Sequence, residues 1–187
     1  MGPTTHGVSG AGSRPQVVLI GPPGSGKTST GQALAELLGA PFHDTDHAVE
    51  LAEGKPISDI FIEDGEPAFR RLERAAVLSA LDSVEGVLAL GAGAAMDDEV
   101  QQALAGHAVV FLDVGIADAA KRVGFDRSRP LLLINPRQQW VKLMEQRRPT
   151  YERLASTRVD TAGHSAQEVA EEIAGWLHGR QGREERP

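Results

Sequence analysis

Cysteine is missing from this chain of 187 residues, which excludes disulfide bonds and thiolate metal sites. A chain without cysteine suits a reducing compartment, and we expect a cytoplasmic protein. No apolar run approaches the roughly 18 residues that a membrane-spanning helix needs, so no membrane partner is expected. The formal net charge of −7 does not favour nucleic acid as a partner either. Any bound anion must therefore be held by a local cluster of cationic side chains.

The two ends of the chain differ in composition from its middle. Residues 1–15 are rich in Gly, Ser, Thr and Pro and lack the apolar segment of a signal peptide, so we expect a disordered N-terminal tail. Residues 180–187 are polar and charged, and we expect a flexible C-terminal tail. The stretch between them, 16–179, has the length of one compact domain. No large exposed apolar stripe is evident, which favours a monomer.

Short apolar or β-branched runs alternate with helix-forming stretches along this domain. Strands are expected at 16–20, 41–44, 86–90, 108–112 and 157–160. Helices are expected at 27–38, up to about 53, at 57–62, 66–81 and 116–123, at 137–155 with an interruption near Pro149, and around 169–177. The stretch 124–136 has no clean period and is expected to be a mobile lid. The alternation predicts an α/β fold of three layers, a mostly parallel five-stranded sheet with helices on both faces. Ligands of such sheets bind beyond the carboxyl ends of the strands.

The first of these strand ends carries a phosphate-binding sequence. Residues 21–28, Gly-Pro-Pro-Gly-Ser-Gly-Lys-Thr, match G-x-x-x-x-G-K-[ST]. The glycines allow successive N–H groups to point at phosphate oxygens, and the following helix adds its positive N-terminus. Lys27 is expected to reach the β- and γ-phosphates, and Thr28 to bind Mg²⁺. A chance match occurs in about 1% of chains of this length, and the expected strand–loop–helix context makes a P-loop the better interpretation.

Two carboxylates follow the second expected strand, in Asp44-Thr-Asp46. Beside a P-loop, one acid can hold Mg²⁺ directly or through water, and a second can accept the proton of an attacking hydroxyl. The alternative is that Asp46 only caps the next helix. The spacing alone leaves both interpretations open.

Three arginines are candidates for binding an anionic substrate, namely Arg70, Arg129 and Arg147. A guanidinium group pairs bidentately with carboxylate or phosphate, and an arginine on a closing lid can meet charge that develops on the transferred group. For any one arginine taken singly, a solvated surface charge is the simpler interpretation. We expect that simpler role for three others, Arg71, Arg74 and Arg148.

Several short segments in a fixed order resemble shikimate kinase, a family of the nucleoside-monophosphate-kinase-like P-loop group. They are Asp44-Thr-Asp46, Asp64-Gly-Glu66 with Phe69-Arg70, Gly91-Ala-Gly93, Arg129-Pro-Leu-Leu132, Arg147 with Tyr151, and Arg158-Val-Asp160. The resemblance runs from about residue 16 to about residue 179. The P-loop alone is generic, and the ordered set is much more specific than any one member of it.

The resemblance implies a P-loop NTPase fold and the reaction ATP + shikimate → ADP + 3-phosphoshikimate, in aromatic amino acid biosynthesis, with Mg²⁺ as cofactor. The catalytic residues it implies are Asp46, which would bind the shikimate hydroxyls, Lys27, and Arg129, which would close with the lid onto phosphate and substrate. The implied shikimate contacts are Asp46, Phe61, Phe69, Arg70, Gly91, Ala92, Gly93 and Arg147, with Glu73 holding Arg70. The implied nucleotide contacts are Gly24, Ser25, Gly26, Lys27, Thr28, Ser29, Arg122 near adenine, and Arg129. The implied Mg²⁺ ligands are Thr28 and, through water, Asp44.

One departure concerns Gly91-Ala92-Gly93, where the family usually has three glycines. Alanine is strained only if its position needs a positive φ, and we expect the change to be mild. The segment 162–166 also looks divergent, so no adenine contact is predicted there.

Other functions remain as alternatives. The nearest is another small-molecule kinase, for gluconate or a nucleoside monophosphate, whose substrates are anionic too. A GTPase switch would need N-K-x-D, which this chain lacks. A catalytically dead paralogue is disfavoured because Lys27, Asp46 and Arg129 are all present.

Overall fold

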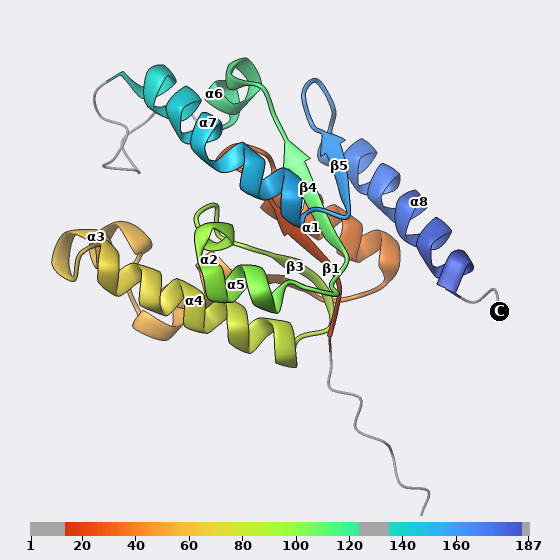
Figure 1. Ribbon diagram of the computed structural model, residues 1–187, viewed down its shortest axis with the longest axis horizontal. Helices are drawn as coiled ribbons and strands as arrows, with labels where there is room; N and C mark the ends of the chain where they lie inside the picture. Colours follow the sequence, from red (N-terminus) through yellow and green to blue (C-terminus); the bar gives the residue numbers. More distant parts are fainter. Residues whose placement is uncertain (1–13, 124–134, 185–187) are drawn as a thin grey trace, which may run out of the picture.

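The protein, seen in a computed structural model that describes residues 14–123 and 135–184, is built on one parallel sheet (Figure 1). Its strands are β1 (Pro15–Ile20), β2 (Phe42–Asp44), β3 (Gly86–Ala89), β4 (Val109–Asp113) and β5 (Thr157–Asp160), in the spatial order β2-β3-β1-β4-β5. Every pair of neighbouring strands is parallel. The predicted fold class is therefore confirmed.

The helices lie close to the predicted positions. They are α1 (Lys27–Leu38), α2 (Thr45–Glu53), α3 (Ile57–Glu63), α4 (Glu66–Ser83), α5 (Asp98–Ala103), α6 (Ile116–Val123), α7 (Pro136–Leu154) and α8 (Ala166–Glu184). The short helices η1 (Ala94–Met96) and α5 were not predicted. Helix α8 continues past residue 179, where we expected the folded domain to end. Most of the expected lid, 124–134, and most of the N-terminal tail, 1–13, lie outside the described residues.

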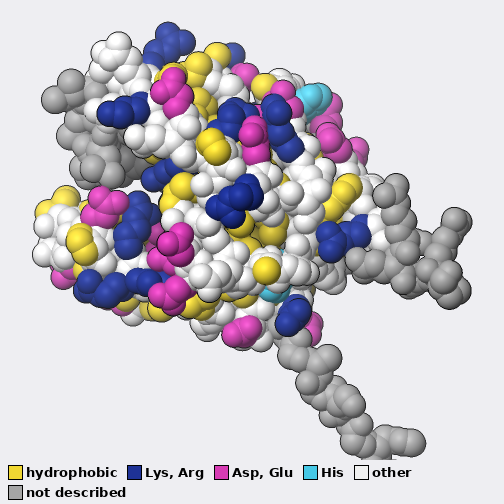
Figure 2. Space-filling model, viewed as in Figure 1, with side chains coloured by type: hydrophobic (Ala, Val, Ile, Leu, Met, Phe, Trp, Pro, Cys, Tyr) yellow, Lys and Arg dark blue, Asp and Glu magenta, His cyan; other side chains and the backbone are white. Residues whose placement is uncertain are grey.

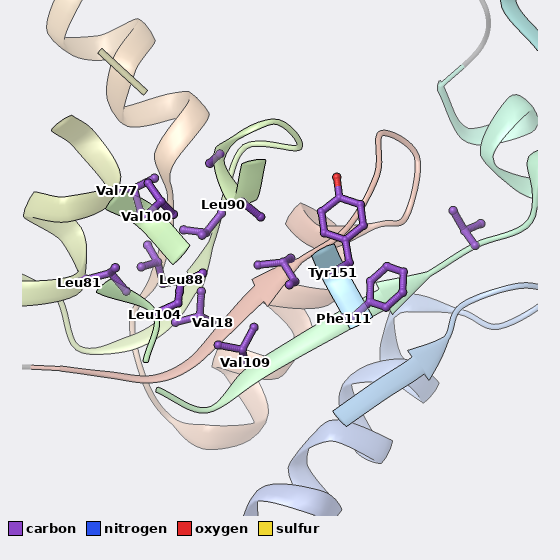
Figure 3. Close-up of a cluster of buried hydrophobic side chains, with 14 of the residues drawn as sticks. Val18, Val77, Leu81, Leu88, Leu90, Val100, Leu104, Val109, Phe111 and Tyr151 are labelled. Atoms are coloured by element: carbon purple, nitrogen blue, oxygen red, sulfur yellow. The ribbon is translucent and has the colours of Figure 1, made fainter. Parts of the chain in front are cut away.

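Alternate side chains of the central strand point to opposite faces of the sheet, as the period of two in a strand requires. Val18 and Ile20 of β1 belong to a core cluster that α4, α5 and α7 cover. Val17 and Leu19 belong to a second cluster, which α1 and α8 cover on the other face. Figure 3 shows the first cluster, with Phe111 of β4 beside Tyr151 of α7. The sheet is thus buried on both faces. A binding site can therefore form only at the ends of the strands.

Helix α7 is continuous through Pro149, so the predicted interruption was wrong. Proline cannot donate to the carbonyl of residue i−4, here that of Glu145, and an interior proline costs a helix about 3 kcal/mol. Met144 and Tyr151, on either side of Pro149, are both buried in the first core cluster. Their packing against the sheet holds the two halves of the helix in line.

A small third cluster lies between α2, α3 and α4. It consists of Val49, Ile60 and Phe69, and Phe61 packs against it. This cluster fixes α4, which carries Arg70, relative to α2, which carries Asp46. In the part of the chain that the structure describes, no helix is both long and apolar enough to cross a bilayer.

Candidate active site

The predicted phosphate loop connects β1 to α1, as the motif requires. Gly24 and Gly26 have φ values of 82° and 87°, which side-chain-bearing residues rarely adopt. At Gly21, a Cβ would lie 2.5 Å from the carbonyl oxygen of Leu112 and 2.9 Å from Ser25 Oγ. The glycines of the motif therefore serve both conformation and close packing against β4.

The lysine of this loop is folded back over it. Lys27 Nζ donates to the carbonyl oxygens of Gly21 at 3.0 Å and Pro22 at 3.2 Å. Ser25 is buried, whereas Thr28 and Ser29 are exposed in the first turn of α1. The predicted nucleotide contacts from Gly24 to Ser29 thus lie at the N-terminus of α1, where the helix dipole favours an anion.

Two oxygen-bearing side chains meet beside this loop. Thr28 Oγ1 donates to Asp44 Oδ2 at 2.8 Å, and the other oxygen, Asp44 Oδ1, accepts from the backbone N–H of Asp46 at 3.0 Å. Asp44 is therefore the N-cap of α2, and the alternative role of Asp46 as that cap is wrong. Mg²⁺ prefers oxygen ligands and often takes one protein carboxylate together with phosphate and water, so Thr28 and Asp44 fit this ion. Within 14–123 and 135–184 there is no cluster of three or more acidic or histidine side chains suited to a metal.

The turn at Gly91-Ala92-Gly93 follows β3 and forms the centre of a second group of side chains. A Cβ at Gly91 would overlap Asp46 Oδ1 and would lie 2.6 Å from Glu73 Oε1. A Cβ at Gly93 would overlap the guanidinium group of Arg70. Asp46 from α2 and Arg70 from α4 therefore meet at this turn.

Helix α7 completes the group from the other side. Arg147 Nη1 donates to the carbonyl oxygen of Ala92 at 2.9 Å. The backbone N–H of Gly91 donates to Thr45 Oγ1 at 3.0 Å, which ties the turn to the start of α2. Three of the four side chains that we expected in one site, Asp46, Arg70 and Arg147, are thus brought together, and Arg129 lies outside the described residues.

The glycines of this turn are required by space and not by conformation. Gly93 has φ −94° and ψ −20°, which alanine tolerates. Among the described residues, Asn135 is the only non-glycine with positive φ, so Ala92 is unstrained. Ala92 is 7% exposed, so its methyl group is buried. Ala92 therefore meets the condition under which we expected alanine to be a mild change, and the effect itself stays a prediction.

Arg70 is held by two carboxylates of its own helix. Its Nη1 donates to Glu73 Oε2 at 2.6 Å, and its Nε and Nη2 donate to Glu66 Oε1 at 3.2 and 3.0 Å. Burial alone would lower the pKa of Arg70, but Glu73 and Glu66 raise it overall, so the guanidinium stays charged. The Glu73 side chain is only 5% exposed, and burial raises its pKa although Arg70 opposes the shift. Glu73 therefore makes the contact that its expected supporting role needs.

The two predicted pocket aromatics differ in burial. Phe69 is buried in the third cluster, and Phe61 is half-buried with its ring centroid 4.7 Å from that of Phe69. The guanidinium carbon of Arg70 lies 5.3 Å from the Phe69 ring centroid. Phe69 thus mainly supports Arg70, and Phe61 retains the more accessible ring.

Arg122, on α6, contacts the phosphate loop directly. Its Nη1 lies 3.4 Å from the Gly24 carbonyl oxygen and 2.9 Å from Thr161 Oγ1, and its Nη2 donates to the Thr161 carbonyl. It therefore ties the P-loop to the segment between β5 and α8. This places Arg122 on the nucleotide side, and its stacking on adenine remains a prediction.

Arg148 is not the surface charge that we expected. It donates through both Nη1 and Nη2 to Asp113, each at 2.7 Å, and Arg158 Nη2 reaches the same carboxylate at 2.7 Å. The Asp113 side chain is 5% exposed. An acid at the end of an otherwise apolar strand was the sequence signal for a buried ion pair. Arg71 donates to the Pro67 carbonyl, and Arg74 donates to the Glu99 carboxylate. Both of these partners are exposed.

Tyr151 and Trp140 are contacts whose roles sequence reasoning missed. Tyr151 Oη donates to the Ala92 carbonyl at 2.6 Å, and Trp140 Nε1 donates to the Pro23 carbonyl of the phosphate loop at 3.2 Å. Buried tyrosine and tryptophan usually find such partners. Only the aromatic residues themselves, not their partners, could be read from the sequence.

Charge on the face of the molecule seen in Figure 2 is mixed. Figure 2 shows Lys and Arg side chains interspersed with Asp and Glu over the visible face. At the site itself, the cationic side chains described above are Lys27, Arg70, Arg122 and Arg147.

The comparisons with known proteins agree with one another. The family model for shikimate kinase matches residues 23–178. A shikimate kinase of Salinispora arenicola is 53% identical over 163 residues, which span 87% of this chain and 98% of that protein. One of Thermobifida fusca is 55% identical over 162 residues, with 87% and 94% covered.

Solved structures give the same result. The shikimate kinase of Acinetobacter baumannii in complex with shikimate has a TM-score of 0.85 at 33% identity, with 90% of this chain and 94% of that chain covered. A gluconokinase from Sinorhizobium meliloti has a TM-score of 0.56 at 25% identity, with 89% and 91% covered.

Proposed function

The chain belongs to the shikimate kinase family, and we propose that it transfers the γ-phosphate of MgATP to the 3-hydroxyl of shikimate, giving ADP and 3-phosphoshikimate. It is thus a phosphotransferase with an alcohol group as acceptor, acting in aromatic amino acid biosynthesis. The observation that carries the proposal is the meeting of Asp46, Arg70 and Arg147 at the 91–93 turn. Strand β3, which leads to this turn, is the direct neighbour of β1, which leads to the phosphate loop.

The nucleotide half of the site uses the P-loop. Lys27 donates to two carbonyls of the loop in this structure. With ATP bound, it would donate to the β- and γ-phosphates instead. Thr28 and Asp44 would hold Mg²⁺, which neutralises charge on the phosphates when bound. Arg122 would lie beside the nucleotide, where it already supports the loop.

The acceptor half uses charge of both signs. Arg70 and Arg147 would clamp the shikimate carboxylate, because guanidinium groups pair well with carboxylates. Asp46 would accept a hydrogen bond from the attacking hydroxyl and orient it, or take its proton as transfer proceeds. Arg129 would contact both the transferred phosphate and the substrate from the segment that follows α6. Phosphoryl transfer depends mainly on such positioning and charge stabilisation.

The assembly and cellular setting are also proposals. We infer a monomer in the cytoplasm. The absence of cysteine suits that compartment, and the large apolar side chains most exposed in the described part, Leu51 and Ile62, are few and lie on short helices. Light scattering coupled to gel filtration measures the oligomeric state directly.

The test is turnover of purified protein with MgATP and shikimate, followed by coupled detection of ADP. Gluconate and nucleoside monophosphates serve as rival acceptors, and we expect shikimate alone to support rapid turnover.

Asp46→Asn should bind ATP nearly as well as wild type but lose most turnover. Unchanged turnover in this variant would refute the role of Asp46.

Arg70→Ala should raise the shikimate KM by about 10- to 150-fold, the equivalent of a charged hydrogen bond of roughly 1.5–3 kcal/mol. Arg71→Ala is the matched control, because Arg71 is the next residue on α4 and donates to Pro67 of its own helix. A wild-type KM in Arg70→Ala would remove the carboxylate clamp.

A further inference from the structure

Helix α7 contacts both halves of the proposed active site, each through a buried aromatic donor. Trp140 is 5% exposed, and its Nε1 donates to the Pro23 carbonyl of the phosphate loop at 3.2 Å. Tyr151 is fully buried, and its hydroxyl donates to the Ala92 carbonyl at 2.6 Å. Side chains of one helix thus donate to a backbone carbonyl in the phosphate loop and to another in the 91–93 turn.

The contact at Ala92 is reinforced by a neighbour. Arg147 Nη1 donates to the same carbonyl at 2.9 Å, so Tyr151 and Arg147 share one acceptor. Burial raises the pKa of the Tyr151 hydroxyl, although Arg147 opposes the shift, so the hydroxyl keeps its proton and remains a donor. The Tyr151 ring also stacks on Phe111, with ring centroids 5.2 Å apart (Figure 3).

The helix between these two contacts is anchored to the sheet. It is continuous through Pro149, and Arg148 binds the buried carboxylate of Asp113 at the end of β4. Met144 packs in the core between Trp140 and the proline. These contacts fix α7 to the sheet between Trp140 and Tyr151.

We propose that Trp140 and Tyr151 are positioning residues, Trp140 for the phosphate loop and Tyr151 for the 91–93 turn, with α7 as their common support. The inference rests on the proposed function, because the turn matters only if it binds the acceptor. In-line transfer requires the nucleotide and the acceptor to be aligned, and small displacements reduce the rate strongly. The competing explanation is that both bonds only satisfy buried carbonyls and stabilise the fold.

The experiment compares Tyr151→Phe and Trp140→Phe in the full chain. Tyr151→Phe keeps the ring stack and removes only the hydroxyl. We expect its shikimate KM to rise about 2- to 12-fold, the equivalent of one ordinary hydrogen bond, with little change in the ATP KM. Trp140→Phe should raise the ATP KM by a similar factor and leave the shikimate KM nearly unchanged. Both variants should have a lower kcat, because alignment depends on both loops.

Met144→Ala is the matched control, since Met144 is buried on the same helix in the same cluster as Trp140 and Tyr151. It should lower the melting temperature without a selective change in either KM. Trp140→Tyr is a second variant that keeps an aromatic ring but lacks the indole N–H, and it should behave like Trp140→Phe. If Tyr151→Phe and both Trp140 variants lower only thermal stability, as Met144→Ala does, the positioning roles are overturned.

Two measurements separate this inference from the proposed function. Wild-type turnover of shikimate by MgATP tests the function alone. ADP binding to Trp140→Phe, measured by equilibrium dialysis without any acceptor, tests the nucleotide side of the inference alone. Binding weakened by the same factor as the ATP KM supports the role of Trp140, and wild-type binding overturns it.

Discussion

Replacing Gly93 by alanine isolates the contact between the acceptor turn and Arg70. The backbone at position 93, with φ −94° and ψ −20°, accepts alanine without strain. The new methyl group, however, would overlap Arg70 Nη1 and lie 2.8 Å from its guanidinium carbon. Either the arginine or the turn must move, so the substitution acts on the site and leaves the local backbone conformation intact.

The size of the effect follows from what Arg70 loses when it moves. Its Nη1 makes a bond of 2.6 Å to Glu73, whose side chain is 5% exposed. Hydrogen bonds to charged groups contribute roughly 1.5–3 kcal/mol. If the displaced guanidinium no longer meets the substrate carboxylate, the shikimate KM should rise by about 10- to 150-fold. The ATP KM should change little, because the phosphate loop is not touched.

The assay is steady-state turnover with coupled ADP detection, with shikimate and ATP varied in turn. Ala92→Gly is the matched control, because it changes the neighbouring residue of the same turn in the opposite direction. It should keep a near wild-type shikimate KM and lose about 0.4–1 kcal/mol of stability through added freedom of the unfolded chain. A wild-type shikimate KM in Gly93→Ala would refute the steric argument.

Three further predictions concern buried charge, pH and the metal. Asp113→Asn should lower the free energy of unfolding in urea by roughly 1.5–3 kcal/mol, because Arg148 and Arg158 lose charged hydrogen bonds to their shared carboxylate. The surface control Arg74→Ala should cost less than about 1 kcal/mol. Burial raises the pKa of Glu73, so the contribution of this group to stability is lost as pH rises through its folded pKa, and the stability of wild type relative to Glu73→Gln should fall over that range. Asp44→Asn should raise the Mg²⁺ concentration for half-maximal activity about tenfold.

Each of these has a clear contrary result. Equal losses in Asp113→Asn and Arg74→Ala would mean that the buried pair adds no more than a surface pair. Parallel stability–pH curves for wild type and Glu73→Gln would show that Glu73 does not titrate differently in the folded protein. An unchanged Mg²⁺ requirement in Asp44→Asn would remove Asp44 from the metal site.

The phosphate loop could be predicted from local sequence because its chemistry is local. Consecutive N–H groups, glycines with positive φ and the start of a helix lie within residues 21–28, and the structure has them there. The alternation of strands and helices could be predicted too. The spacing of apolar residues and the length of each run indicate a helix or a strand, whatever it packs against. Local reasoning failed at Pro149, where burial of Met144 and Tyr151 in the core outweighs the preference of proline for a break.

The side chains around the 91–93 turn could not be predicted in this way. Asp46, Arg70 and Arg147 lie on three helices, and the sequence pointed to them together only through resemblance to a family. Their convergence depends on how α2, α4 and α7 pack around the end of β3.

The sequence by itself predicted a phosphate loop at residues 21–28 and a parallel sheet, because the signals for both lie in neighbouring residues. Only the tertiary structure decided that Arg148 is paired with Asp113 and that the glycines beside Ala92 make room for side chains. The physical reason is the same in each case. Burial, close approach and ion pairing are relations between distant segments, and a side chain's role depends on the partner that folding brings to it.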